Sequence, residues 1–202
     1  MRYPLAPNGV WFAQQGEGHL RGFNMAFVRL AGCSVGCAEC DTDWSVSEKV
    51  EAHVIADRVD SVTPGVLNDR WVWITGGEPA DHNLVPLITA LRKKRFSIAV
   101  ATSGHKRIIP PVDWLSVSPH NLSERVQPYG NELKIVDGLN GMSLENLEPQ
   151  GPPGFMYYYV QPLWDMGADR EDPESLRRCV EFSKANPNWS LSRQDHKHWG
   201  VA

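Results

Sequence analysis

The chain has 202 residues, with 20 Lys or Arg against 24 Asp or Glu, so its formal net charge is -4 at pH 7. This length is sufficient for one domain with a substantial core, and we expect a single domain over residues 1–202. The chain has no run of basic residues of the kind that binds a phosphate backbone, and no apolar stretch is long enough to span a bilayer. We therefore expect neither a nucleic-acid partner nor a membrane partner. Met1–Pro7 carries no signal or transit pattern, which favours a cytoplasmic protein.

Short apolar runs alternate with amphipathic segments along the chain. Runs rich in β-branched or aromatic residues predict strands at Met25–Leu30, Trp71–Thr75, Ser97–Thr102, Trp114–Ser118, Glu132–Val136 and Met156–Val160, and a further one at Trp189–Ser192. Apolar residues at helical spacing predict helices at Ser47–Val62, with Ser47 as N-cap, at Leu84–Lys94 and at Pro173–Ala185. This alternation predicts an α/β fold with a mainly parallel sheet of about six strands and few helices.

The most informative feature is a loop with three cysteines, Cys33, Cys37 and Cys40, directly after the first predicted strand. Three thiolates are one too few for a closed tetrahedral zinc site or for a four-iron cluster held by protein alone. One metal position would stay open for a substrate or cofactor. The loop is therefore a candidate site of chemistry.

Two other interpretations of the cysteines are open. Zinc could take a fourth ligand from His19, Glu39, Asp41 or Asp43, and the spacing alone does not separate zinc from an iron-sulfur cluster. A disulfide framework is less favoured, because the fourth cysteine, Cys179, lies far away in a predicted helix and the chain shows no secretory signal. We expect Cys179 to be a buried thiol.

Small and polar residues follow the later predicted strands, in the segments Thr75–Pro79, Thr102–Gly104, Ser118–His120 and Gln161–Pro162. The carboxyl ends of parallel strands meet at one edge of a sheet, so we expect a ligand to lie across these segments and the cysteine loop.

The run Gly76-Gly77-Glu78 has a specific use at such an edge. The glycines remove side chains that would block a ligand, and Glu78 offers a carboxylate to an ammonium group, although a tight structural turn is the simpler interpretation of the run alone. Together with the cysteine loop it resembles the radical S-adenosylmethionine family, in which three cysteines at this spacing bind a 4Fe-4S cluster and a Gly-Gly-Glu run meets the methionine amino group. The resemblance implies a partial (β/α) barrel-like sheet, with a 4Fe-4S cluster and S-adenosyl-L-methionine as cofactors.

Further motifs narrow the resemblance: Gln15–Gly18, Phe27–Cys33, Cys40–Thr42, Asn131–Lys134 and Gln194–Lys197. From about Val10 to the C-terminus, the chain resembles the family of 7-carboxy-7-deazaguanine synthases. This implies a carbon-nitrogen lyase of queuosine (7-deazapurine) biosynthesis, which converts 6-carboxy-5,6,7,8-tetrahydropterin to 7-carboxy-7-deazaguanine with loss of ammonia. It also implies Mg2+, an electron donor such as flavodoxin, and a homodimer as the candidate assembly.

The resemblance assigns roles to individual residues. The metal ligands would be Cys33, Cys37 and Cys40 for the cluster and Thr42 for Mg2+. S-adenosylmethionine would contact Gly76, Gly77, Glu78, Ser118, Pro119, His120, Gln161, Pro162, Leu163 and Trp164. The pterin would contact Gln14, Gln15, Gly16, Glu17, Arg29, Thr75, His196 and Ala202. Because the cofactor carries the chemistry, no side chain is expected to be catalytic.

Some of these residues also stand out on physical grounds. An inward-facing Arg29 on an apolar strand is costly unless paired, and the pterin carboxylate is a suitable partner; a salt bridge with Glu17 or another acid is the alternative. Gln194 and His196 are two residues apart, so in an extended tail they would face the same side. Thr42 offers a single hydroxyl, so Mg2+ would also need the substrate carboxylate and waters.

The chain departs from the family pattern at several positions. Glu39 stands where an aromatic residue is usual, Ala101 where a glutamate is usual, Leu163-Trp164 where Met-Asp is usual, and Ala202 where proline is frequent. Two other functions are open: an activating enzyme for a glycyl-radical protein, and a noncatalytic zinc or iron-sulfur binding module. The motifs Gln15–Gly18 and Gln194–Lys197 argue against the activating enzyme, since in the synthases they bind the pterin.

Overall fold

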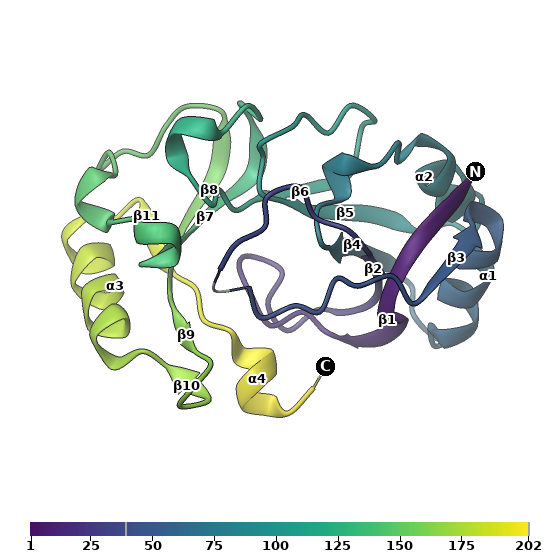
Figure 1. The fold of residues 1–202 in the computed structure, drawn as a ribbon, viewed down its shortest axis with the longest axis horizontal. Helices are drawn as coiled ribbons and strands as arrows, with labels where there is room; N and C mark the ends of the chain where they lie inside the picture. The colour runs from purple at the N-terminus through teal and green to yellow at the C-terminus, as the bar shows by residue number, and fades with distance from the viewer. Residues whose placement is uncertain (39, 202) are drawn as a thin grey trace.

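The structure is a computed structural model that describes residues 1–38 and 40–201 (Figure 1). In this part of the chain the main sheet has nine strands in the order β11-β8-β7-β6-β5-β4-β2-β1-β3, and β9 pairs with β10 separately. The strands from β2 to β11 in this order are parallel, and β1 joins β2 antiparallel. The α/β fold with a mainly parallel sheet is confirmed, with nine strands in place of about six.

The parallel strands are β2 (Asn24–Leu30), β4 (Trp71–Gly76), β5 (Ser97–Thr102), β6 (Trp114–Val117), β7 (Gly130–Asp137), β8 (Phe155–Pro162) and β11 (Trp189–Leu191). Each coincides with a predicted strand to within two residues at either end. These runs are recognisable in the sequence because a parallel strand is buried on both faces and therefore reads as a nearly continuous apolar segment.

The sequence patterns do not predict β1 (Arg2–Gln14) or β3 (Glu48–Glu51), nor the short pair β9 (Trp164–Asp165) and β10 (Arg170–Glu171). The predicted helix Ser47–Val62 is confirmed from Ala52 to Val62, but its predicted start with Ser47 as N-cap is wrong. β3 pairs with β1, with Val50 opposite Tyr3, and helix α1 (Ala52–Val62) begins only after this pairing ends. The presence of a partner strand decides between strand and helix here, and the local sequence does not reveal that partner.

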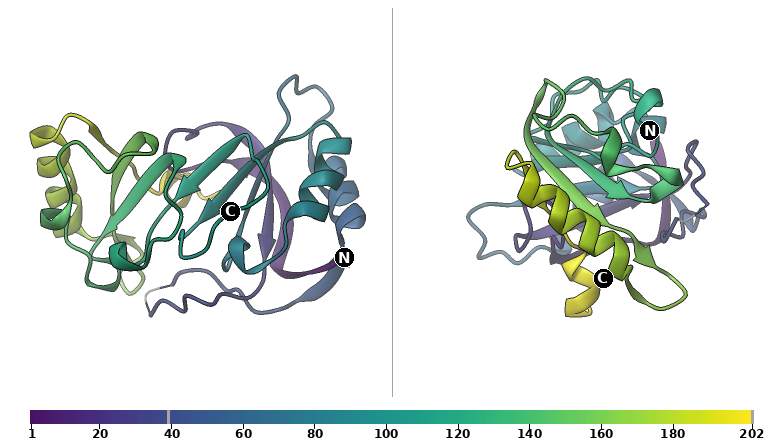
Figure 2. Two further views of the ribbon diagram at one scale, coloured as in Figure 1. Left: turned by 90° about the horizontal axis from the view of Figure 1, so that it is seen from above. Right: turned by 90° about the vertical axis from the view of Figure 1, so that its left-hand side faces the viewer.

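The other helices are α2 (Val85–Lys93), α3 (Pro173–Ala185) and α4 (Asp195–Trp199), and short 3-10 turns lie at η1 (Pro79–Asp81), η2 (Leu122–Glu124), η3 (Leu139–Gly141) and η4 (Leu144–Asn146). The predictions for α2 and α3 are confirmed. α1 and α2 lie together at one end of the sheet and α3 lies at the other end, beside β8 and β11 (Figure 2). α4 lies on the open side of the curved sheet (Figure 1).

Alternate residues of each strand face different sides of the sheet. On β2, Ala26, Val28 and Leu30 are fully buried in the main core, which α1 and α2 cover. Phe27 belongs to a second cluster with Trp73 and the other inner residues of neighbouring strands. Two residues nearer the carboxyl ends, the inner face carries polar residues, such as Arg29 after Phe27 and Thr75 after Trp73. The fold thereby brings a set of polar side chains to the carboxyl ends of the strands.

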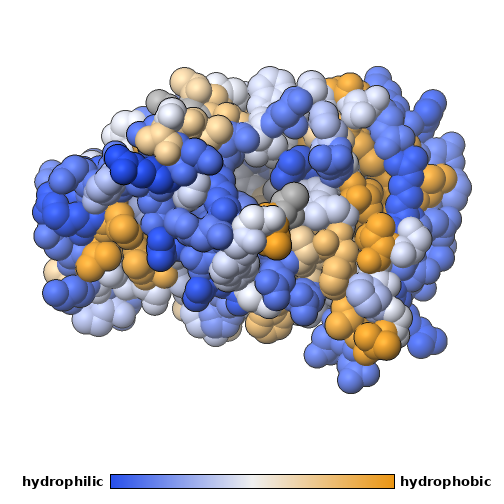
Figure 3. All heavy atoms as spheres, turned by 90° about the horizontal axis from the view of Figure 1, so that it is seen from below, coloured by the Kyte–Doolittle hydropathy of each residue, from blue (hydrophilic) through white to orange (hydrophobic). Residues whose placement is uncertain are grey.

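Hydrophilic residues cover most of the molecular face drawn in Figure 3, and hydrophobic residues form separate groups among them. Within the described residues, no helix combines the length and the apolar character needed to cross a membrane.

Candidate active site

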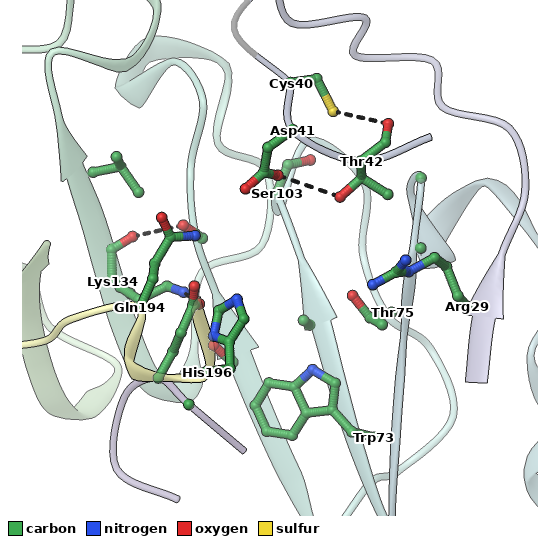
Figure 4. A pocket seen from close by; sticks show the side chains of 18 of the residues that line it. Arg29, Cys40, Asp41, Thr42, Trp73, Thr75, Ser103, Lys134, Gln194 and His196 are labelled. Atoms are coloured by element: carbon green, nitrogen blue, oxygen red, sulfur yellow. Dashed lines mark hydrogen bonds and ion pairs between the residues drawn. The ribbon is translucent and has the colours of Figure 1, made fainter. Parts of the chain in front are cut away.

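A cavity of about 550 Å3 lies at the carboxyl ends of the parallel strands. Its walls come from the end of β1, the cysteine loop, the ends of β2 and β4 to β8, and the segment around α4. Figure 4 shows Arg29 and Thr75 side by side on adjacent strands, with Cys40 and Thr42 above them. The cavity thus forms where the order of strands and loops predicts a ligand site.

Most residues predicted to bind a ligand line this cavity. They are Gln14, Gln15, Gly16, Glu17, Arg29, Cys33, Cys37, Cys40, Thr42, Thr75, Gly76, Gly77, Glu78, Ser118, His120, Gln161, Leu163, Trp164 and His196. Pro119 and Pro162 are not among the lining residues, although their chain neighbours are. Ala202 and Glu39 lie outside the described residues.

The glycine pair brings the β4 turn against the cysteine loop. A Cβ on Gly76, which has φ +135°, would lie 2.0 Å from the Leu30 carbonyl oxygen, and one on Gly77 would lie 1.9 Å from the Gly32 carbonyl oxygen. The Glu78 N–H donates to that same Gly32 oxygen at 3.0 Å. The close approach that these glycines permit is therefore between two segments of the chain, and it fixes the position of Cys33, the next residue of the loop.

Glu78 is buried and its carboxylate already holds the neighbouring turns together. Oε1 accepts the Ala80 N–H at 2.8 Å and the Thr102 hydroxyl at 2.6 Å, while Oε2 accepts the Ser103 N–H at 2.8 Å and the Ser103 hydroxyl at 2.6 Å. Glu78 still lines the cavity, so its predicted contact with an ammonium group stays a prediction. The structure adds a second role, which is to join the end of β4 to the end of β5.

All three cysteines line one cavity, and the Cys37 sulfur lies 2.7 Å from Nδ1 of His120, whose pKa is lowered by burial. Among residues 1–38 and 40–201, no three His, Cys, Asp or Glu side chains are grouped so that they could hold a single metal ion. A 4Fe-4S cluster on the three thiols stays a prediction.

His19, one proposed zinc ligand, lies away from the cysteines. Its ring stacks on Tyr157 at 3.9 Å and on Trp114 at 5.2 Å between centroids, and it is not among the cavity residues. Cys179 is fully buried in α3, and burial raises the pKa of its thiol to about 12. The expectation of a buried Cys179 is confirmed.

Arg29 points into the cavity with its guanidinium 4.7 Å from the Trp11 ring centroid (Figure 4). Burial lowers the pKa of Arg29 and the charge of Asp41 partly offsets this effect. No carboxylate of the described residues forms an ion pair with it. The alternative of an Arg29–Glu17 salt bridge is wrong, because Glu17 pairs with Lys134.

Lys134 is the site residue that sequence reasoning missed. It appeared only within a family motif, yet its ammonium lines the cavity and forms a partly buried ion pair with Glu17. Burial alone would raise the pKa of Glu17, but the charges of Lys134 and His196 and hydrogen bonds from Lys134 and Gln194 lower it to about 2. A lysine placed on the inner face of a strand, where neighbouring positions are apolar, is the signal that could have revealed it.

The C-terminal segment reaches the cavity as a helix. The prediction of an extended tail is wrong, because α4 begins at Asp195, whose N–H donates to the Gly16 carbonyl at 3.1 Å and whose carboxylate pairs with Arg21. Gln194 and His196 nevertheless both line the cavity, and burial lowers the pKa of His196. The tail is thereby docked against the loop that follows β1.

Lys197 connects α4 to the cysteine loop. Its ammonium lies 2.5 Å from the Asp41 carboxylate and 4.6 Å from the Trp164 ring centroid. Three segments far apart in sequence therefore meet at one side of the cavity.

The similarity to known proteins covers nearly the whole chain. The chain is 31% identical over 236 residues to the 7-carboxy-7-deazaguanine synthase of Escherichia coli (strain K12), with 100% of both chains covered. The chain belongs to the 7-carboxy-7-deazaguanine synthase family. It is also 32% identical to the family member from Caulobacter vibrioides, covering 95% of this chain and 96% of that one. No family model matches the chain.

The fold agrees with that of the 7-carboxy-7-deazaguanine synthase family. The crystal structure of QueE from Escherichia coli matches with a TM-score of 0.70 at 29% identity, and the match covers 96% of this chain and 94% of that one. The family consists of radical S-adenosylmethionine lyases of queuosine biosynthesis, so the resemblance stated from the motifs is confirmed. Membership sets aside the glycyl-radical activating enzyme and the noncatalytic binding module.

Proposed function

We propose that this chain converts 6-carboxy-5,6,7,8-tetrahydropterin to 7-carboxy-7-deazaguanine with loss of ammonia. The observation that carries the proposal is the shared cavity: the cysteine loop, the Gly76–Glu78 turn and the pterin-side residues Arg29, Glu17 and His196 all line it. A reaction that begins at a cofactor and ends on a substrate needs both in one enclosed space.

Cys33, Cys37 and Cys40 would hold a 4Fe-4S cluster, because they are the thiols of one loop at the cavity and leave one iron without a protein ligand. With an electron donor such as flavodoxin, this group would supply the one-electron reduction of S-adenosylmethionine that hydrogen abstraction from the pterin requires. The protein's own part is to orient both molecules and to exclude water.

The methionine end of S-adenosylmethionine would lie along the ends of β4, β6 and β8, where Gly77, Ser118 and Gln161 line the cavity. Ser118 is held there by a hydrogen bond from its hydroxyl to the Lys134 carbonyl at 3.0 Å. His120, Leu163 and Trp164 would complete this side of the site, together with Pro119 and Pro162 of the predicted set.

The pterin would lie on the opposite side. Arg29 can pair with its carboxylate, because no carboxylate of the described chain occupies the guanidinium and the apolar Trp11 ring shields it from water. Glu17 is held ionised by Lys134 and can accept the N–H groups of the heterocycle. Burial lowers the pKa of His196, and a neutral imidazole can both donate and accept a hydrogen bond. Gln14, Gln15, Gly16, Thr75 and, by resemblance, Ala202 would add further contacts.

Thr42 would bind Mg2+ together with the substrate carboxylate. Its hydroxyl lies 3.4 Å from an Asp41 carboxylate oxygen, so a second hard oxygen is close by. Binding of the ion near Arg29 would place two cations against the substrate carboxylate and strengthen its binding.

The proposal is tested by an anaerobic assay with reconstituted protein, a reductant, S-adenosylmethionine and the carboxytetrahydropterin. We expect 7-carboxy-7-deazaguanine only when both molecules are present, with a higher rate in Mg2+. If 5'-deoxyadenosine forms and the deazaguanine does not, under verified reducing conditions, the substrate assignment is wrong.

A further inference from the structure

His105 lies behind the wall of the main cavity. A second cavity of about 280 Å3 adjoins the first, and Cys37, Ser103 and His120 line both. His105 lines the second cavity and is not among the lining residues of the first. His105 can therefore influence the cofactor side of the main cavity only through the residues that lie between the two cavities.

Two serines provide that connection. His105 Nε2 lies 2.7 Å from the hydroxyl of Ser34, the residue that follows Cys33, and His105 Nδ1 lies 2.8 Å from the hydroxyl of Ser103. The Ser103 hydroxyl in turn donates to Glu78 at 2.6 Å. One imidazole thus joins the cysteine loop to the carboxylate that organises the β4 and β5 turns.

The hydroxyl groups of Ser34 and Ser103 both donate to carboxylates. The Ser34 hydroxyl donates to Asp81 at 2.7 Å, and Asp81 also accepts the Ser34 N–H at 2.8 Å and pairs with Lys106. Each hydroxyl has one hydrogen, and both hydrogens go to carboxylates. The two hydroxyl oxygens can therefore accept hydrogen bonds from the ring nitrogens of His105.

Carboxylates also lie near both ring nitrogens, since Glu78 and Asp81 are 3.7 Å and 3.6 Å from them. Asp81 pairs with Lys106 as well, and His120 and Glu124 line the second cavity together with His105.

We propose that His105 is a positioning residue that holds the cysteine loop against the Glu78 turn and so preorganises the site for S-adenosylmethionine. This inference rests on the proposed function for the identity of the ligand. The hydrogen bonds that join Ser34 to Ser103 through His105 are independent of that function.

The first experiment measures amide hydrogen exchange in the reconstituted enzyme without substrate. His105→Ala should raise exchange about tenfold or more in both segments that it joins, residues 33–38 and 101–105, since it removes the ring contacts with Ser34 and Ser103. His105→Gln, with one donor amide, should restore part of the protection, and His53→Ala on the exposed face of α1 is the matched control. Exchange within twofold of wild type in both segments of His105→Ala would overturn the proposal.

The second experiment measures equilibrium affinities. His105→Ala should weaken S-adenosylmethionine binding about tenfold or more while iron content and pterin affinity stay unchanged. Equal losses of iron, pterin and S-adenosylmethionine would indicate general disruption and overturn the positioning role. If wild type does not bind S-adenosylmethionine, the proposed function fails, and the exchange result alone decides whether His105 joins the two segments.

Discussion

The guanidinium of Arg29 lies over the indole ring of Trp11, with 4.7 Å between the guanidinium carbon and the ring centroid. β1 and β2 are antiparallel neighbours, so this pair lies at one wall of the cavity. The aromatic ring offers the cation a favourable contact without occupying its hydrogen-bond donors. Arg29 is therefore held in place and available for an anionic ligand.

Arg29→Ala should lose pterin affinity while the cluster and S-adenosylmethionine binding remain. Removing one member of a desolvated charge pair typically costs about 2 to 5 kcal/mol, which corresponds to a weakening of roughly thirtyfold to several thousandfold. Equilibrium binding of the pterin to the anaerobic protein measures the effect. Arg177→Ala, on the exposed face of α3, is the matched control. Unchanged affinity in a folded Arg29→Ala protein would leave Arg29 with a structural role only.

Cys37→Ala should abolish cluster assembly, because the loop would retain two thiolates where three are needed. Cys179→Ala should leave iron and sulfide content unchanged, since that thiol is buried in α3 far along the chain. Iron and sulfide analysis after anaerobic reconstitution measures both. Stoichiometric zinc without sulfide in wild type would contradict the cluster assignment.

The ion pair of Glu17 with Lys134 should make folding stability depend on pH. The pKa of Glu17 is lowered from an ordinary value of 4.5 to about 2, so the stabilisation is fully present above about pH 4.5 and is lost as pH falls towards 2. A shift of this size corresponds to about 3 kcal/mol. Urea unfolding of wild type and Glu17→Gln, in the same cluster state, should give a difference that is largest at neutral pH and shrinks in acid. A difference that does not vary between pH 7 and 3 would show that the carboxylate charge contributes nothing.

Deleting residues 194–202 should abolish turnover while leaving the cluster and most of the fold intact. The segment carries His196 and docks through the Asp195 N–H on Gly16, but it contributes no strand to the main sheet. Product formation, iron content and circular dichroism measure the three expectations. The smaller change His196→Ala should lower pterin affinity with less effect on docking. Near-normal turnover of the truncated protein would make the terminal motif dispensable, as most chain termini are.

The sequence by itself determined the parallel strands and the chemistry of their carboxyl ends. Buried strands such as β4 and β5 read as short apolar runs, and the loop with Cys33, Cys37 and Cys40 places three thiols within eight residues. Both signals are local, because a handful of consecutive residues carries each. For the same reason the family could be recognised from motifs before the fold was known.

Only the tertiary structure decided how distant segments pair. The first residues of a predicted helix form β3 because they pair with β1. The C-terminal segment forms α4, whose first residue, Asp195, is bound by Gly16 and Arg21. Lys134 becomes a site residue only when the sheet brings it to Glu17, although more than a hundred residues separate them along the chain. Hydrogen bonds and ion pairs between such segments depend on positions that the fold creates, and no local pattern of residues encodes them.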